Sequence, residues 1–279
     1  MPNIVTIGDI KCGGDELFLI AGPCVIEDES VMMKTAEKLK KISERLAIPV
    51  IFKSSFQKDN RSSLKNYPGP GLKNGMKMLA KIKKEFGFPI LTDIHHPEQA
   101  ARAAEVADVL QIPAYMSMQS DLIVAAARTD RVVNIKHGQF MAPEHMKNPV
   151  AKCEDSGNKR ILLTERGYTF GYADLIVDPR SFYHLRNIGY PVVFDVTHSV
   201  RKHGIPSVDP RGSSREFLPV LGRAAAGSGL DGLFIETHPE PQKGLCDGSS
   251  MICVYDLEEF LKPLIELHNV EVSHRHNTA

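Results

Sequence analysis

The chain has 279 residues, 42% of them hydrophobic, and its 34 Lys and Arg residues balance its 34 Asp and Glu residues. This balance argues against nucleic acid or an anionic membrane surface as a partner, because both attract proteins through a positive field. The sequence has no run of about 18 apolar residues and no basic segment followed by an apolar one at its start. We therefore expect a cytoplasmic protein.

Eight short apolar segments rich in β-branched residues recur along the chain. They lie at residues 17–22, 49–54, 89–93, 109–113, 131–136, 160–165, 191–196 and 232–237. Helical periodicity appears between them, for example at 30–46 and 98–107. This alternation predicts an α/β fold, a single (β/α)8 TIM barrel, as one domain over residues 1–279 with the barrel at about 15–268. A doubly wound open sheet is the alternative, but no GxGxxG follows the first strand.

Two long segments rich in Gly, Pro and Ser follow predicted strands. Residues 197–217 come after the seventh strand and are expected to form a mobile loop over the mouth of the barrel, and residues 60–72 follow the second strand. The last eight residues, 272–279, are expected to be frayed. The five cysteines are scattered without CxxC spacing, which favours reduced thiols over a disulfide framework.

Polar residues stand at the C-terminal ends of the predicted strands, where barrel enzymes carry their chemistry. They are Cys24, Lys53, Asp93, Gln111, Lys136, Glu165, Arg166, Asp195, His198 and Glu236. The cations of this region, Lys53, Lys58, Arg61, Lys136 and Arg166, indicate a ligand with several negative charges, such as phosphates and a carboxylate. Taken alone, Lys58 and Arg61 are equally consistent with an ordinary charged loop.

A second group of polar residues could form a metal site. Cys24, His198, Glu236 and Asp247 follow strands one, seven and eight, which are neighbours in a closed barrel. Their sulfur, nitrogen and oxygen atoms suit a divalent ion such as Zn²⁺, Fe²⁺, Mn²⁺ or Co²⁺. The spacing alone does not decide this, because a buried cysteine commonly packs as a small hydrophobic residue.

The sequence also carries motifs of a known family. They are AGPCVIE (21–27), FKSSF (52–56), NRSS (60–63), GPGL (69–72), LTDIH (91–95), QIPA (111–114), GQF (138–140), LTERGYTFGYADLIVDPRSF (163–182), FDVTHSV (194–200), REF (215–217) and FIETHPEP (234–241). In these motifs the chain resembles the 3-deoxy-D-manno-octulosonate 8-phosphate (Kdo 8-phosphate) synthases over about residues 15–265. Cys24 after AGP resembles the metal-dependent class, whereas the metal-independent class has asparagine there.

The resemblance implies a homotetrameric barrel that joins phosphoenolpyruvate to arabinose 5-phosphate, releasing phosphate, for the Kdo sugar of lipopolysaccharide. It implies that phosphoenolpyruvate is held by Lys53, Lys58, Gln111, Lys136 and Arg166, and that the aldose phosphate is held by Asn60, Arg61 and Ser62. Ser55 is a further expected substrate-binding residue, and Asp93 is expected near the sugar. His198, Lys53, Lys58 and Asp93 are the expected catalytic residues, and Cys24, His198, Glu236 and Asp247 the expected metal ligands.

Several positions depart from the family pattern. Met118 and Ser120 replace Arg and Thr, His137 replaces Lys, Pro68 replaces Arg, and the usual SGG is altered at Gly212, Ser213 and Ser214. These changes are consistent with drift within one activity, compensated by His137, Arg201 or Arg211. They are also consistent with a paralogue that uses another aldose phosphate, such as erythrose 4-phosphate. A non-catalytic sugar-phosphate-binding barrel is the remaining alternative.

Overall fold

The computed structural model describes residues 2–170 and 173–278, and eight parallel strands form a closed ring in it. Gly171 and Tyr172, within the motif at 163–182, lie outside the described residues. The strands pair in the order β11, β8, β7, β6, β5, β4, β3, β12, and a pairing of β11 with β12 closes the ring. They are β3 Phe18–Gly22, β4 Val50–Lys53, β5 Ile90–Asp93, β6 Val109–Ile112, β7 Val132–Lys136, β8 Ile161–Glu165, β11 Val192–Asp195 and β12 Gly232–His238. The eight predicted strands and the (β/α)8 barrel are confirmed.

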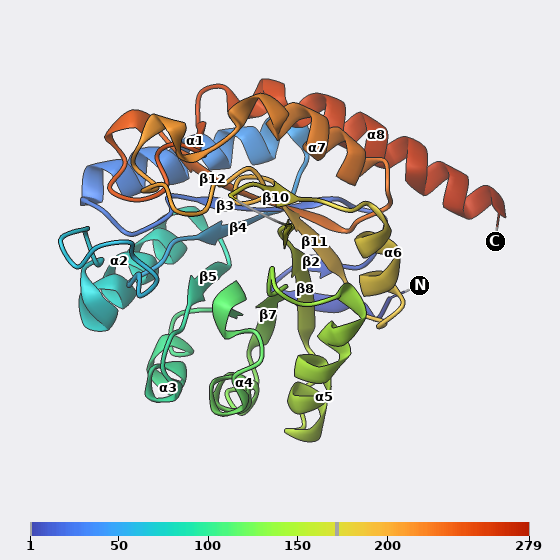
Figure 1. The fold of residues 1–279 in the computed structure, drawn as a ribbon, viewed down its shortest axis with the longest axis horizontal. Helices are drawn as coiled ribbons and strands as arrows, with labels where there is room; N and C mark the ends of the chain where they lie inside the picture. The colour runs from blue at the N-terminus through green and yellow to red at the C-terminus, as the bar shows by residue number, and fades with distance from the viewer. Residues whose placement is uncertain (1, 171–172, 279) are drawn as a thin grey trace.

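Helices surround the ring of strands (Figure 1). They are α1 Glu29–Leu46, α2 Gly71–Phe86, α3 Ala100–Ala103, α4 Ser120–Ala127, α5 Lys147–Asp155, α6 Arg180–Arg186, α7 Leu218–Ala226 and α8 Leu257–Thr278. Helix α1 matches the prediction from Ser30, and the Asp28 side chain caps it by accepting from the Val31 N–H at 2.9 Å. The helix expected at 98–107 is shorter: a 3₁₀ turn at Pro97–Gln99 precedes α3, and α3 ends at Ala103, where a turn follows.

The expectation of a frayed tail was wrong, because α8 continues to Thr278. Its first turns bury Leu257, Leu261 and Leu264 against the core. Farther along, His268 Nε2 donates to the Asp15 carbonyl oxygen at 3.0 Å, and His276 lies 3.1 Å from the Asp15 carboxylate. These contacts hold the last turns against the start of the chain. No helix in the described part is both long and apolar enough to cross a membrane.

In the part of the chain that the structure describes, five short strands lie outside the eight-stranded ring. The segments β1 Val5–Ile7 and β2 Ile10–Cys12 form an antiparallel hairpin, β9 Tyr168–Thr169 pairs with β10 Leu175–Ile176, and β13 Ile252–Cys253 extends the sheet beside β12. Short 3₁₀ helices connect the larger elements, at Ala114–Met116, Pro143–Met146, Pro210–Gly212, Arg215–Phe217 and Pro241–Lys243. None of these elements was predicted from the sequence.

The interior of the barrel changes from apolar to polar along the strands. Its apolar layers form one cluster with the β1–β2 hairpin, so this hairpin covers the N-terminal end of the barrel. The strand members of the cluster are Phe18, Ile20, Ile51, Leu91, Val109, Val132, Leu162, Val193 and Phe234. Because side chains alternate along a strand, the residue two positions later points to the same side. Those residues are polar on most strands: Lys53, Asp93, Gln111, Asn134, Thr164, Asp195 and Glu236. The polar groups therefore converge at the C-terminal end of the barrel.

Candidate active site

Lys53 and Glu236 form a buried ion pair between β4 and β12. Their Nζ and Oε1 atoms are 2.7 Å apart, and their side chains are 1% and 0% exposed. Lys53 Nζ also donates to the Cys24 carbonyl oxygen at 3.0 Å. Burial alone would lower the pKa of Lys53, but the Glu236 carboxylate outweighs it, and the pKa lies above its ordinary value. The Lys53 ammonium therefore stays charged in the barrel interior.

Gly22 permits the close approach of the first two strands at this point. A Cβ atom on Gly22 would lie 2.0 Å from the Lys53 carbonyl oxygen, a distance that no side chain tolerates. The missing side chain lets the turn after β3 come close to the end of β4. Cys24 is thereby placed beside Lys53.

Asp93 at the end of β5 is the centre of a hydrogen-bonded network. Ser55 Oγ donates to it at 2.6 Å, Gln111 Nε2 donates to its other oxygen, and Lys58 Nζ lies 3.5 Å away. Asn134 and Thr164 extend the network along β7 and β8, with Asn134 Nδ2 donating to Gln111 at 2.8 Å and Thr164 Oγ1 donating to Asn134 at 2.7 Å. Burial would raise the pKa of Asp93, but Lys53 and Lys58 hold it well below its ordinary value.

Asp195 at the end of β11 orients two functional side chains. Its Oδ2 atom lies 2.5 Å from Lys136 Nζ and 2.8 Å from His198 Nδ1. Burial opposes ionisation of Asp195, yet His198 and Lys136 keep its pKa well below the ordinary value. Because Asp195 contacts Nδ1, the Nε2 atom of His198 faces Glu236 and Asp247, at 3.8 and 3.7 Å. The phenyl ring of Phe234 lies beneath Lys136, with Nζ 4.3 Å from its centroid.

The four expected metal ligands lie in one place. One group of donor atoms comes from His198, Glu236 and Asp247, and a second from Cys24, Cys246 and Asp247, with the atoms of each group within 4.8 Å of one another. Asp247 belongs to both groups, and Cys24 Sγ lies 3.1 Å from its Oδ2. Glu236 Oε2 is buried without a hydrogen-bond partner among the described residues. This unpartnered oxygen and the mixed donor set fit a divalent cation.

The protonation state of the Cys24 thiol depends on whether a cation is bound between these donor atoms. Burial, the neighbouring Cys246 and the Asp247 carboxylate together raise the pKa of the Cys24 thiol well above its ordinary value. A bound cation reverses this preference, because metal ligation stabilises the thiolate. Cys246 lay outside the expected ligand set, since only the folded loop brings it beside Cys24.

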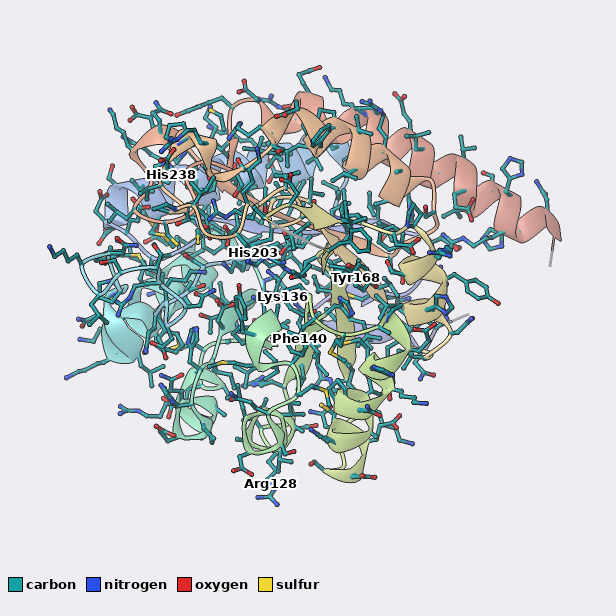
Figure 2. All side chains as sticks on the ribbon, in the orientation of Figure 1. Arg128, Lys136, Phe140, Tyr168, His203 and His238 are labelled. Atoms are coloured by element: carbon teal, nitrogen blue, oxygen red, sulfur yellow. The ribbon has the colours of Figure 1, made fainter. Side chains whose placement is uncertain are left out.

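A cavity of about 250 Å³ opens at this end of the barrel, and a smaller one of about 60 Å³ continues it toward the interior. Lys58, Asn60, Arg166 and His198 line both parts. The inner part adds Lys53, Asp93, Gln111 and Lys136, and the outer part adds Arg61, Ser62, Arg201 and Asp247. Figure 2 shows Lys136 and His203 within the ring of helices, whereas Arg128 at the end of α4 points outward.

The cavity walls contain cationic nitrogens that lack protein partners. Among the described residues, no hydrogen-bond acceptor contacts Nε or Nη1 of Arg166 or Nε of Arg61, although these atoms are buried. Buried guanidinium N–H groups without acceptors are costly unless a ligand supplies them. Lys58 Nζ is held near Asp93 on the same wall. The arrangement is suited to binding oxyanions at two points, one deep and one at the rim.

The sequence-predicted substrate residues lie at different depths. Lys53, Lys58, Gln111, Lys136 and Arg166 are buried, whereas Asn60 and Ser62 are exposed at the rim. Ser55 is fully buried beneath Asp93 and is not among the residues that line the cavity in the described part. Asp195 was expected among the polar strand-end residues but without a role of its own, whereas Asn134 and Thr164 were not singled out. The period-two alternation from Val132 and Leu162 could have identified Asn134 and Thr164.

The departures from the family pattern have different surroundings. His137 is fully buried behind Lys136, with its ring 4.7 Å from that of Tyr168, and burial lowers its pKa. A neutral His137 does not replace a lysine charge. Met118 is 38% exposed. The Pro68 carbonyl oxygen accepts from the Lys58 N–H at 2.9 Å.

The two arginines considered as compensating cations also differ. Arg211 is exposed and paired with Asp209 at 2.7 Å. Arg201 is largely buried and lines the cavity. Of the two, only Arg201 is positioned to affect the site.

The model of the DAHP synthetase I family matches residues 3–272. A 2-dehydro-3-deoxyphosphooctonate aldolase of Geotalea uraniireducens is 52% identical over 95% of this chain and 97% of its own length. Proteins of the same name from Trichlorobacter lovleyi and Fusobacterium nucleatum are each 50% identical, over 97% and 96% of this chain and 99% and 96% of their own lengths. The chain therefore belongs to the DAHP synthetase I family, in its 2-dehydro-3-deoxyphosphooctonate aldolase (Kdo 8-phosphate synthase) branch.

Proposed function

We propose that this protein condenses phosphoenolpyruvate with arabinose 5-phosphate and water, giving 3-deoxy-D-manno-octulosonate 8-phosphate and phosphate for Kdo synthesis. The observation that carries the proposal is the cavity at the C-terminal end of the barrel. Three lysines and one arginine line its inner part. Buried N–H groups of Arg166 and Arg61 have no acceptor among the described residues, which supports binding of anionic groups at two depths. The names of the relatives agree with a product of this kind.

The inner pocket suits phosphoenolpyruvate. Lys53, Lys58, Lys136 and Arg166 would neutralise its phosphate and carboxylate, and Gln111 would donate or accept beside them. Ser55 would act through Asp93, to which it donates. The rim residues Asn60, Arg61 and Ser62 would bind the phosphate of the aldose, which places the aldehyde end toward the inner pocket.

The reaction joins C3 of phosphoenolpyruvate to the aldehyde carbon while water adds at C2. The tetrahedral intermediate then loses phosphate by cleavage of the C–O bond. Two anionic substrates must be held together, and the buried lysines and arginines offset their repulsion in a site where water is scarce. Burial opposes the charge of Lys53 and Lys58, but the nearby Glu236 and Asp93 carboxylates raise their pKa values, so both are charged at neutral pH. Asp93 stays ionised and would orient a sugar hydroxyl, and His198 is oriented by Asp195.

We also propose that the protein binds a divalent metal, Zn²⁺, Fe²⁺, Mn²⁺ or Co²⁺, through Cys24, His198, Glu236 and Asp247. The orphaned Glu236 oxygen and the close donor atoms support this. A bound ion would supply Lewis acidity toward the aldehyde or the attacking water. His198 would bind it through Nε2, because Asp195 contacts Nδ1.

We propose a cytoplasmic homotetramer as the working form. Several large apolar side chains are exposed near the mouth of the barrel, including Tyr115, Phe140 and Phe170, at 53%, 59% and 77% exposure. The segments that carry Phe140 and Phe170 are joined by the Thr169 N–H, which donates to the Gln139 carbonyl oxygen at 2.8 Å. An exposed apolar surface of this kind is typical of an interface between subunits.

The substrate proposal is tested by incubating the metal-loaded protein with phosphoenolpyruvate and a panel of aldose phosphates, and by identifying products by mass. We expect arabinose 5-phosphate to give the highest kcat/KM and an eight-carbon product. A preference for erythrose 4-phosphate with a seven-carbon product would show that the substitutions at Met118, His137 and Pro68 mark a changed specificity. Binding of both substrates without a product would support a non-catalytic barrel.

A further inference from the structure

Arg201 joins the loop after β11 to the loop after β12, which carries Asp247. Its Nη1 atom donates to the Gly212 carbonyl oxygen at 2.9 Å and to Ser249 Oγ at 2.7 Å, and Nη2 donates to the Ile205 carbonyl oxygen at 3.4 Å. Its Nε atom lies 3.5 Å from Asp247 Oδ1. The Arg201 side chain is 14% exposed, so these contacts are largely shielded from water.

Asp247 has a backbone conformation that needs support from its neighbours. Its φ angle is +50°, in the left-handed region that non-glycine residues rarely adopt. The Asp247 N–H donates to Ser207 Oγ at 3.2 Å, and its carbonyl oxygen accepts from the N–H groups of Ser250 and Met251 at 2.9 and 3.2 Å. The first of these contacts comes from the loop after β11. The position of the Asp247 carboxylate thus depends on how that loop is folded.

The guanidinium of Arg201 differs from that of Arg166 in having protein acceptors for most of its N–H groups. Both Nη1 hydrogens are engaged with protein acceptors, one Nη2 hydrogen is engaged with Ile205, and Nε faces Asp247. Arg166, in contrast, has two buried nitrogens without a protein partner among the described residues. Arg201 therefore cannot present a free pair of N–H groups to a phosphate without breaking contacts in its own loop.

We propose that Arg201 is a positioning residue that holds the Asp247 carboxylate for metal binding and fixes the loop after β11 in its folded form. The inference rests on the proposed metal site and adds a residue that is not a ligand. The positively charged Arg201 guanidinium faces Oδ1 of the Asp247 carboxylate. The other oxygen, Oδ2, is left directed at His198 and Cys24. Partners of this kind orient metal-binding carboxylates, and their loss commonly weakens metal affinity by about 10–100-fold.

The test measures Co²⁺ binding to the full-length protein without turnover, by competition with a chelator and by the visible absorption bands of the bound ion. The variants are Arg201→Gln and Arg201→Lys, with Arg211→Gln as control, because Arg211 lies in the same loop but is exposed and paired with Asp209. We expect about a 10-fold or greater rise in the Co²⁺ dissociation constant for Arg201→Gln, a smaller rise for Arg201→Lys, and no change for Arg211→Gln. Ser249→Ala, which removes one anchor of Arg201, should weaken Co²⁺ binding less than Arg201→Gln does.

The outcomes separate this inference from the metal site on which it rests. If the unmodified protein binds no Co²⁺, the metal site itself is overturned, and the role of Arg201 with it. If the unmodified protein binds Co²⁺ and both Arg201 variants match its affinity and spectrum, the positioning role is overturned. A raised KM for the aldose phosphate with unchanged Co²⁺ affinity would instead assign Arg201 to substrate binding and overturn the inference in the same way.

Discussion

Replacing Lys53 by methionine should destabilise the protein strongly, because it leaves the Glu236 carboxylate buried without its partner. The two side chains are 1% and 0% exposed and their charged atoms are 2.7 Å apart. Removing one partner of such a pair commonly costs about 3–5 kcal/mol of unfolding free energy. His198 Nε2, 3.8 Å from Glu236 Oε2, offers partial compensation, so we expect a loss of about 3 kcal/mol, at the lower end of that range.

The measurement is urea unfolding at pH 7 with a chelator present and at one fixed subunit concentration, since metal or subunit binding would shift the apparent stability. Lys41→Met is the matched control, because Lys41 forms an exposed pair with Glu37, and loss of an exposed pair should leave the urea midpoint nearly unchanged. The double variant Lys53→Met with Glu236→Gln removes both charges and should recover much of the loss. A Lys53→Met protein within about 1 kcal/mol of the unmodified one, or a double variant as unstable as the single, would refute this reasoning.

Three further predictions concern the metal, the acid response and assembly. Cys24→Ser should lower bound metal and activity together, while Cys253→Ser leaves both unchanged; metal analysis and the phosphate-release assay check this, and full activity after exhaustive chelation would contradict it. The folded pKa of Asp195 lies below its ordinary value of 3.8, so its stabilisation is complete above that value and is lost as pH falls further. Stability should therefore fall less steeply below pH 3.8 for Asp195→Asn than for the unmodified protein, and an unchanged slope would count against the ion pairs of Asp195 with His198 and Lys136. Sedimentation should show tetramers, and a fully active monomer would contradict the tetramer as the working form.

The barrel could be predicted from the sequence because its strands are buried on both sides and therefore apolar over their whole length. Segments such as 131–136 and 232–237 stand out from the amphipathic helices that separate them. The hairpin at Val5–Ile7 and Ile10–Cys12 could not be predicted in the same way. Its strands are three residues long, and their burial depends on the open end of a barrel that forms elsewhere in the chain.

The positions of the candidate site residues follow partly from strand geometry and partly from loop folding. Lys53, Asp93 and Gln111 are each two residues beyond an apolar interior position, so their convergence could be predicted from the alternation of a strand. Cys246 and Arg201 lie in loops without such a period. Their contacts with Asp247 depend on hydrogen bonds between the loops, such as Ser249 N–H to the Ser207 carbonyl oxygen at 3.2 Å, which no local pattern encodes.

The most direct test of the proposed activity measures phosphate release from phosphoenolpyruvate by the purified, metal-loaded protein, with and without arabinose 5-phosphate. We predict no release from phosphoenolpyruvate alone, and one phosphate released for each eight-carbon product formed when arabinose 5-phosphate is added. Equal release with and without the sugar would identify a phosphatase, and no release in either case would contradict a synthase that uses these two substrates.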